Sequence, residues 1–217
     1  MEDSNRQTDT HRHSDTHTHY VLSDIADVLS GYASRYDLTE TPGSNQYIVQ
    51  LAQLSALPYP HTLESIDWTL CKEITLEGKS PPILNVGDIL LTARSRRFCA
   101  VLVHPDVVNK TIVPSHHFYI IRVKPTMRQL IEPAFLCHLL NHPCTTLQLP
   151  QHHQANGGFG HNRTVVKSLN LNFPTAQQQQ DFSTLAGLIQ SQNQAYYELI
   201  DVNSALLQSS LDKLLNE

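Results

Sequence analysis

The chain has 217 residues, of which 40% are apolar and 16% are charged, so it can form one domain with an appendage or two very small domains. Its formal charge of −5 does not by itself indicate a nucleic-acid partner. No stretch approaches the ~18 consecutive apolar residues of a membrane span, and the first residues do not resemble a secretory signal. The four cysteines contain no CxxC pair, so we expect a cytoplasmic protein with reduced thiols. Secreted, membrane-spanning and collagen-like proteins are excluded.

The charges are unevenly distributed along the chain. Residues 1–83 carry five Lys and Arg against twelve carboxylates, and residues 169–217 carry one against five. Residues 84–168 carry nine against three. A basic centre between acidic ends makes a polyanionic partner for the central segment plausible despite the net charge.

Residues 1–19 have no apolar side chain beyond Met1, so burial cannot offset the entropy of ordering and a disordered tail is predicted. Order is predicted to begin at Tyr20. A short helix is expected over residues 23–29, capped by Ser23 and ended by Gly31.

The middle of the chain is predicted to be mainly strands. Residues 46–54 alternate like a strand, and residues 82–92 read as strand, turn and strand. Further strands are expected over residues 100–103 and 111–123, followed by a helix over residues 132–140 and a loop over residues 147–168.

The strongest local pattern lies at the C-terminal end. Residues 176–216 contain one glycine and no proline, and apolar residues follow the alternating three–four spacing of a coiled-coil seam. The predicted seam side chains are Phe182, Leu185, Ile189, Tyr196, Leu199 and Leu206. About forty residues make a helix of roughly 60 Å, which needs a partner helix to bury its apolar stripe. The polar seam positions Gln192 and Asn203 are typical devices for fixing register and partner number.

Two polar, basic loops are the candidate DNA-binding segments. Arg94, Arg96 and Arg97 follow a predicted strand, and residues 156–163 form a second, glycine-rich loop. Arg fits guanine edges and Asn or Gln fits adenine edges, while glycines let the backbone approach phosphate. The alternative is an ordinary solvated surface with local salt bridges.

No catalytic, metal or cofactor site is predicted. The Walker and Rossmann glycine patterns and the GxSxG elbow are missing from the sequence. Asp67, Glu77 and Lys79 match the loose spacing of metal-dependent nucleases, but they fall in a turn where metal geometry is hard to hold. The pairs at 116–117 and 152–153 are adjacent histidines that would point to opposite faces of a strand.

The order of several motifs resembles the S (specificity) subunits of type I restriction–modification systems. The motifs are residues 22–32 (LSDIADVLSGY), 86–92 (VGDILLT), 133–140 (PAFLCHLL) and 169–174 (LNLNFP), followed by Gln180, Leu207, Ser209, Leu211 and Leu214. The resemblance covers residues 20–216 and implies an α+β fold, in which a mixed-sheet target recognition domain (residues 20–173) precedes one long coiled-coil helix (residues 174–217).

The resemblance implies a DNA-recognition subunit that reads half of a bipartite site and is not itself an enzyme. It implies partners that do the chemistry, a methyltransferase subunit carrying S-adenosylmethionine and a restriction subunit. The expected DNA contacts are Arg94, Arg96, Arg97, Lys124, Gln154, Asn156, His161, Asn162, Arg163 and Lys167. S subunits usually carry two recognition domains and two helices, whereas this chain has one of each, so we expect a homodimer or pairing with a second half-subunit. The alternative is a coiled-coil interaction protein that does not read DNA.

Overall fold

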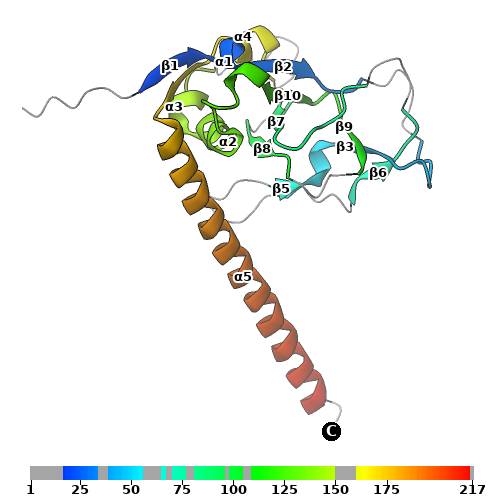
Figure 1. The fold of residues 1–217 in the computed structure, drawn as a ribbon. Helices are drawn as coiled ribbons and strands as arrows, with labels where there is room; N and C mark the ends of the chain where they lie inside the picture. Colours follow the sequence, from blue (N-terminus) through cyan, green and yellow to red (C-terminus); the bar gives the residue numbers. More distant parts are fainter. Residues whose placement is uncertain are drawn as a thin grey trace, which may run out of the picture.

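The computed structural model describes residues 17–33, 39–55, 65–66, 70–76, 81–95, 98–104, 109–149 and 160–215. Figure 1 shows short strands and helices packed into one body, from which a single long helix extends away. Mixed sheets followed by one long C-terminal helix make an α+β fold, so the predicted fold class is confirmed.

A four-stranded antiparallel sheet forms the centre of the body, in the order β2-β10-β7-β8. Its strands are β2 (Ala26–Ser30), β10 (Phe118–Val123), β7 (Ile89–Thr92) and β8 (Ala100–Leu102). Ile121 of β10 lies opposite Val28 on one side and opposite Ile89 on the other. All four residues of β7 are buried, which explains its continuous apolar sequence.

The two faces of this sheet carry separate hydrophobic clusters. Ile89 and Ile121 belong to a cluster with residues of α1 (Leu22–Ile25), α2 (Pro133–Asn141) and β11 (Asn170–Phe173). Their chain neighbours Leu90 and Ile120 belong to a cluster with residues of β3 (Gln46–Val49) and β9 (Thr111–Pro114). Successive strand residues point to opposite faces, so one apolar run supplies both clusters.

Smaller sheets flank the central one. In a three-stranded mixed sheet, β3 is antiparallel to β6 (Lys72–Glu73) and parallel to β9. The 3-10 turn η1 (Leu51–Gln53) leads directly into β4 (Leu54–Ser55), which pairs with β5 (Ser65–Ile66). β1 (Thr18–Val21) is antiparallel to β11, so the first described strand lies beside the last strand before α5 (Ala176–Leu215).

The predicted helix over residues 23–29 is wrong beyond Ile25, because β2 begins at Ala26. In β2, Ala26 and Val28 are buried while Asp27 is exposed, which is the alternation of a strand. Ser23 is not the cap, since the N-cap is Val21. Gly31 does not end a helix. A Cβ at Gly31 would lie 2.1 Å from the Ser115 carbonyl oxygen, so glycine is needed where the two backbones approach.

Other predicted boundaries shift as well. β1 starts at Thr18, inside the predicted tail of residues 1–19, of which residues 1–16 lie outside the described residues. The described part of the predicted loop at 147–168 contains a helix, α4 (Arg163–Lys167). Residues 81–88 form no strand, because Pro81 and Pro82 cannot donate to a ladder.

Two predicted strands are interrupted. The strand predicted over residues 46–54 ends at Val49 and is followed by η1 and the start of β4, and the one predicted over residues 111–123 is divided by a turn into β9 and β10. β8, α2 and α5 are confirmed within two residues of their predicted ends, and α3 (Pro143–Thr146) and η4 (Pro125–Met127) were not predicted. Within the described residues, no helix has the length and apolar character needed to cross a membrane.

Candidate nucleic-acid interface and partner helix

The described ends of the two predicted basic loops meet beside the end of β7. The Ala93 carbonyl accepts a hydrogen bond from the His161 backbone N–H at 2.9 Å. A Cβ at Gly160 would lie 2.6 Å from that carbonyl oxygen, so glycine allows the close contact. The Ala93 N–H in turn donates to the His117 carbonyl at 2.7 Å. Three segments that are distant in sequence therefore meet at this edge.

Two of the predicted DNA contacts are placed at this junction. Arg94 is exposed, and its backbone N–H donates to the His117 carbonyl at 3.2 Å. His161 is half-buried, with its ring edge-on to Phe98 at 5.3 Å and its carbonyl accepting from the Tyr119 hydroxyl at 3.0 Å. Burial lowers the pKa of His161, so its ring is neutral at neutral pH. Arg96, Arg97, Gln154 and Asn156 lie outside the described residues.

Helix α4 carries the next group of predicted contacts. The Asn162 side chain accepts from the Thr164 N–H at 2.9 Å, so this amide caps α4. Arg163 and Lys167 are four residues apart and therefore share one face of the helix, where Arg163 is exposed and Lys167 is half-buried. In the chain, α4 begins two residues after His161.

Lys124 is separated from that junction. His117 directly precedes β10 and Lys124 directly follows it. The six residues of β10 span roughly 20 Å, so the two residues lie at opposite ends of this strand. The Lys124 ammonium donates to the carbonyls of Ser23 at 2.6 Å and Asp24 at 3.2 Å. Both carbonyls belong to the end of the short helix α1, where they have no hydrogen-bond partner within the helix. Lys124 therefore stabilises the domain, in addition to any role in binding.

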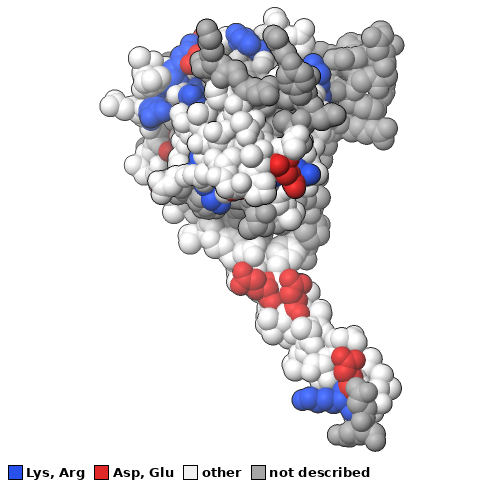
Figure 2. All heavy atoms as spheres, turned by 90° about the vertical axis from the view of Figure 1, so that its right-hand side faces the viewer, with Lys and Arg blue, Asp and Glu red and all other residues white. Residues whose placement is uncertain are grey.

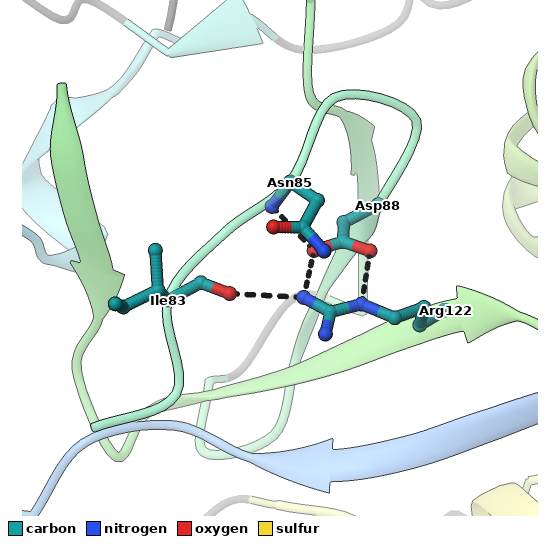
Figure 3. A network of polar contacts seen from close by, with 4 residues as sticks. All are labelled: Ile83, Asn85, Asp88 and Arg122. Atoms are coloured by element: carbon teal, nitrogen blue, oxygen red, sulfur yellow. Dashed lines mark hydrogen bonds and ion pairs between the residues drawn. The ribbon is translucent and has the colours of Figure 1, made fainter. Parts of the chain in front are cut away.

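Arg122, one of the nine cations of the basic centre, is held in a buried network (Figure 3). Its Nε and one terminal nitrogen donate to the two Asp88 carboxylate oxygens at 2.8 and 2.7 Å. The same terminal nitrogen donates to the Ile83 carbonyl at 2.9 Å, and Asp88 also accepts from the Asn85 N–H at 2.7 Å. Asp88 is 2% exposed, so its place in the Gly-Asp-Ile-Leu motif is explained by structure.

Helix α5 is fastened to the domain by its first two turns. Thr175 and Gln178 form reciprocal side-chain to backbone hydrogen bonds, which is a capping box. Gln179 is 1% exposed, and its amide accepts from the Glu132 N–H and donates to the carbonyls of Leu130 and Pro174. Phe182 packs edge-on against Phe135 at 5.5 Å and His138 at 5.2 Å. Gln180, the residue singled out by the resemblance, is exposed.

The rest of α5 projects from the domain (Figure 1). Its large apolar side chains are exposed. The six predicted seam residues are between 42% and 64% exposed, and every described residue from Glu198 to Leu215 is exposed. A second row of apolar side chains on α5, which lies beside the seam and includes Leu188 and Val202, is exposed as well. A continuous apolar surface of this kind marks an interaction site.

The charges divide between the two parts of the molecule. Figure 2 shows Lys and Arg gathered over the domain, whereas Asp and Glu prevail along α5. The cation of α5 is Lys213, near its end. Among the described residues, no group of three or more His, Cys, Asp or Glu is placed to hold a metal ion. Asp67, Glu77 and Lys79 lie outside the described residues.

The prediction of a strand through His116 and His117 is wrong. Both residues lie in the turn between β9 and β10, and their rings lie together at 4.0 Å between centroids, not on opposite faces. The signal that was overlooked is the preceding Pro114, which marks the end of a strand. This turn adds two imidazoles to the junction at Ala93.

No protein-family model and no curated protein matches the sequence, so the likeness to known proteins is structural. The HsdS subunit of Thermoanaerobacter tengcongensis superposes with a TM-score of 0.59 at 16% identity, over 85% of this chain and 44% of that one. The S subunit of a type I restriction–modification system from M. genitalium gives 0.56 at 10% identity, over 88% and 43%.

A third structure, from a study of complex assembly in the type I restriction–modification system, gives a TM-score of 0.58 at 13% identity, over 86% of this chain and 42% of that one. The chain therefore spans less than half the length of the proteins it matches. It has the fold of the S subunits of type I restriction–modification systems.

Proposed function

We propose that this chain is a cytoplasmic DNA-recognition unit of a type I restriction–modification system. The domain of residues 20–173 reads one half of a bipartite site, and the helix of residues 174–217 sets the distance to the other half. The observation that carries the proposal is the combination of an S-subunit fold with one 40-residue helix that leaves the domain and keeps its apolar stripe uncovered.

The junction after β7 supports the DNA-reading face. It brings Arg94 and the segment before α4 together, and Arg163 and Lys167 continue the basic surface along α4. We assign phosphate or guanine contacts to Arg94, Arg96 and Arg97, and base or phosphate contacts to Gln154, Asn156, His161, Asn162 and Arg163. Lys124 and Lys167 contact the DNA backbone. Since two of the three ammonium hydrogens of Lys124 are already engaged, one remains for phosphate.

The exposed stripe of α5 supports the partner helix. We propose that a second helix of the same kind, from another copy of the chain or from a second half-subunit, packs antiparallel on Phe182, Leu185, Ile189, Tyr196, Leu199 and Leu206. Antiparallel packing places the two recognition domains at opposite ends of a rod of roughly 60 Å. A methyltransferase subunit and a restriction subunit would assemble on this scaffold and supply the chemistry, so the chain itself is not an enzyme.

Selection from a random duplex library tests the proposal. The purified chain, alone and with a methyltransferase subunit of the same system, should enrich a split motif with a fixed spacer. Arg94→Ala should weaken binding and lower the dependence of log K on log salt by about one. Arg128→Ala is the matched control, because Arg128 is an exposed arginine beyond the opposite end of β10.

The alternative function is a coiled-coil interaction protein that does not read DNA, which the exposed stripe of α5 alone would also support. Enrichment of no motif under either condition, with α5 still associating, would favour this alternative over DNA recognition.

A further inference from the structure

The turn between β9 and β10 holds two histidines in a fixed position. The Ser115 N–H donates to the Val49 carbonyl at 2.8 Å, and the Phe118 N–H closes the turn on the Ser115 carbonyl at 3.0 Å. Gly31 packs its backbone directly against Ser115. The turn is therefore anchored to β2 and β3 at once, and its side chains are presented from a rigid base.

Three basic groups converge at this turn. The rings of His116 and His117 lie 4.0 Å apart with an interplanar angle of 36°. His116 is exposed, His117 is half-buried, and the Ser115 hydroxyl lies 3.4 Å from His117 Nδ1. Arg94, whose backbone is bonded to His117, is exposed beside them. Within the described part of the chain, none of the three forms an ion pair with a carboxylate.

This arrangement disfavours a positive charge on the unbound turn. Burial first, then the charges of His116 and Arg94, lower the pKa of His117. Arg94 from the end of β7 and His116 from the turn itself are the described charged groups that act on His117, and Ser115 adds a neutral hydroxyl. A phosphate group placed among them would offset this repulsion and favour the protonated imidazole.

We propose that Arg94, His116 and His117 bind a backbone phosphate of duplex DNA and take up a proton when they do so. The inference rests on the proposed DNA-recognition function and deepens it by naming a phosphate site and its coupling to pH. Phosphate contacts carry no sequence information, so the site would fix the register of the domain on DNA of any sequence. Binding becomes tighter as the pH falls, because the bound state holds more protons than the free state.

A labelled random-sequence duplex of about 30 base pairs is a sufficient probe, because phosphate contacts act in non-specific binding. Affinity of the full chain is measured at low salt by fluorescence anisotropy between about pH 8 and about pH 6, the range in which imidazoles titrate. Proton uptake is counted by calorimetry in two buffers of different ionisation enthalpy. The variants are His116→Gln/His117→Gln and a matched control, His104→Gln/His142→Gln, in which both residues are exposed.

The wild-type chain and the control variant should gain about tenfold in affinity over this range and take up a proton on binding. The His116→Gln/His117→Gln variant should lose most of both effects. His116→Gln alone, at an exposed position where folding is not at risk, should lose part of them. Binding with unchanged pH dependence in the double variant would refute the phosphate site but leave DNA recognition standing. No binding of the duplex at either pH, by the wild-type chain alone or together with the methyltransferase subunit, would refute both.

Discussion

The domain and helix α5 differ in which of their side chains are buried and paired and which are left exposed. In the domain and at its junction with α5, buried polar side chains are paired internally, as Asp88 is with Arg122 and Gln179 is with three backbone groups. Along α5, large apolar side chains remain exposed for most of its length. A folded body with a satisfied interior needs no partner for its stability, whereas an uncovered apolar rod does. The difference is what the proposed division of roles, assembly through α5 and recognition by the domain, would require.

The largest expected effect is on the ion pair between the buried Asp88 carboxylate and the half-buried Arg122 guanidinium. Asp88→Ala leaves the Arg122 guanidinium without its carboxylate and the Asn85 N–H without an acceptor, so the free energy of unfolding should fall by about 3–5 kcal/mol. Urea unfolding followed by circular dichroism measures this. Glu40→Gln is the control, because Glu40 pairs with Lys72 at 3.1 Å on the surface and its loss should cost about 1 kcal/mol or less. Equal losses in the two variants would contradict the structural role of Asp88.

A smaller effect is expected where the two regions join. Gln179→Leu removes three hydrogen bonds and leaves buried backbone groups unpaired, so unfolding should become easier by about 1–3 kcal/mol. Gln180→Leu, at the exposed neighbouring position, should change stability by about 0.5 kcal/mol or less. Spin labels on the domain and on α5 should also show a broader distance distribution in Gln179→Leu. An unchanged distribution and stability would mean that Gln179 does not hold the helix.

The smallest of the three effects is the pH dependence of the Tm, which is expected for the domain and not for α5. Burial lowers the pKa of His117, His138 and His161, so these groups bind fewer protons in the folded than in the unfolded domain. Their stabilising contribution is present above the unfolded pKa of about 6.5 and is lost as the pH falls below it. The Tm of the domain should therefore decrease by a few degrees on acidification through that range.

Replacement of one of these histidines tests the cause. His138→Phe keeps an aromatic ring against Phe182 and removes one titrating group, so the decrease in Tm should become smaller. Helix α5 contains no histidine, and its far-UV signal should not follow the same titration. A Tm that is independent of pH in the wild-type chain would contradict the role of these buried imidazoles.

The sequence predicted the parts of the fold that depend on long, regular patterns. The seam of α5 is predictable because its positions repeat with an alternating three–four spacing over about forty residues without a proline. The helix predicted over residues 23–29 is wrong from Ala26 onward, because the apolar spacing there fits both a helix and a strand until pairing with β10 decides between them. Gly31 was misread for the same reason, since its close contact with Ser115 is a tertiary feature.

The candidate site was predicted in its residue types but not in its arrangement. The two basic loops are separate in the sequence pattern, and the hydrogen bond from the His161 N–H to the Ala93 carbonyl brings their described ends together. Lys124 and Asn162 are predicted as DNA contacts and Arg122 is counted in the basic centre, yet each is engaged by backbone or carboxylate partners that sequence spacing does not reveal. The same holds for Gln179, whose buried role differs from that of its exposed neighbour Gln180.

The most direct test of the central claim, that α5 is the assembly surface, is the mass of the full chain in solution by light scattering at several concentrations. The wild-type chain should be a dimer, and Leu199→Lys/Leu206→Lys should be a monomer because charges replace two seam residues. Gln194→Lys/Gln208→Lys, with the same added charge on the opposite side of the helix, should remain a dimer. A wild-type chain that is monomeric at every concentration, or a dimer that survives the seam substitutions, would contradict pairing of two copies through α5.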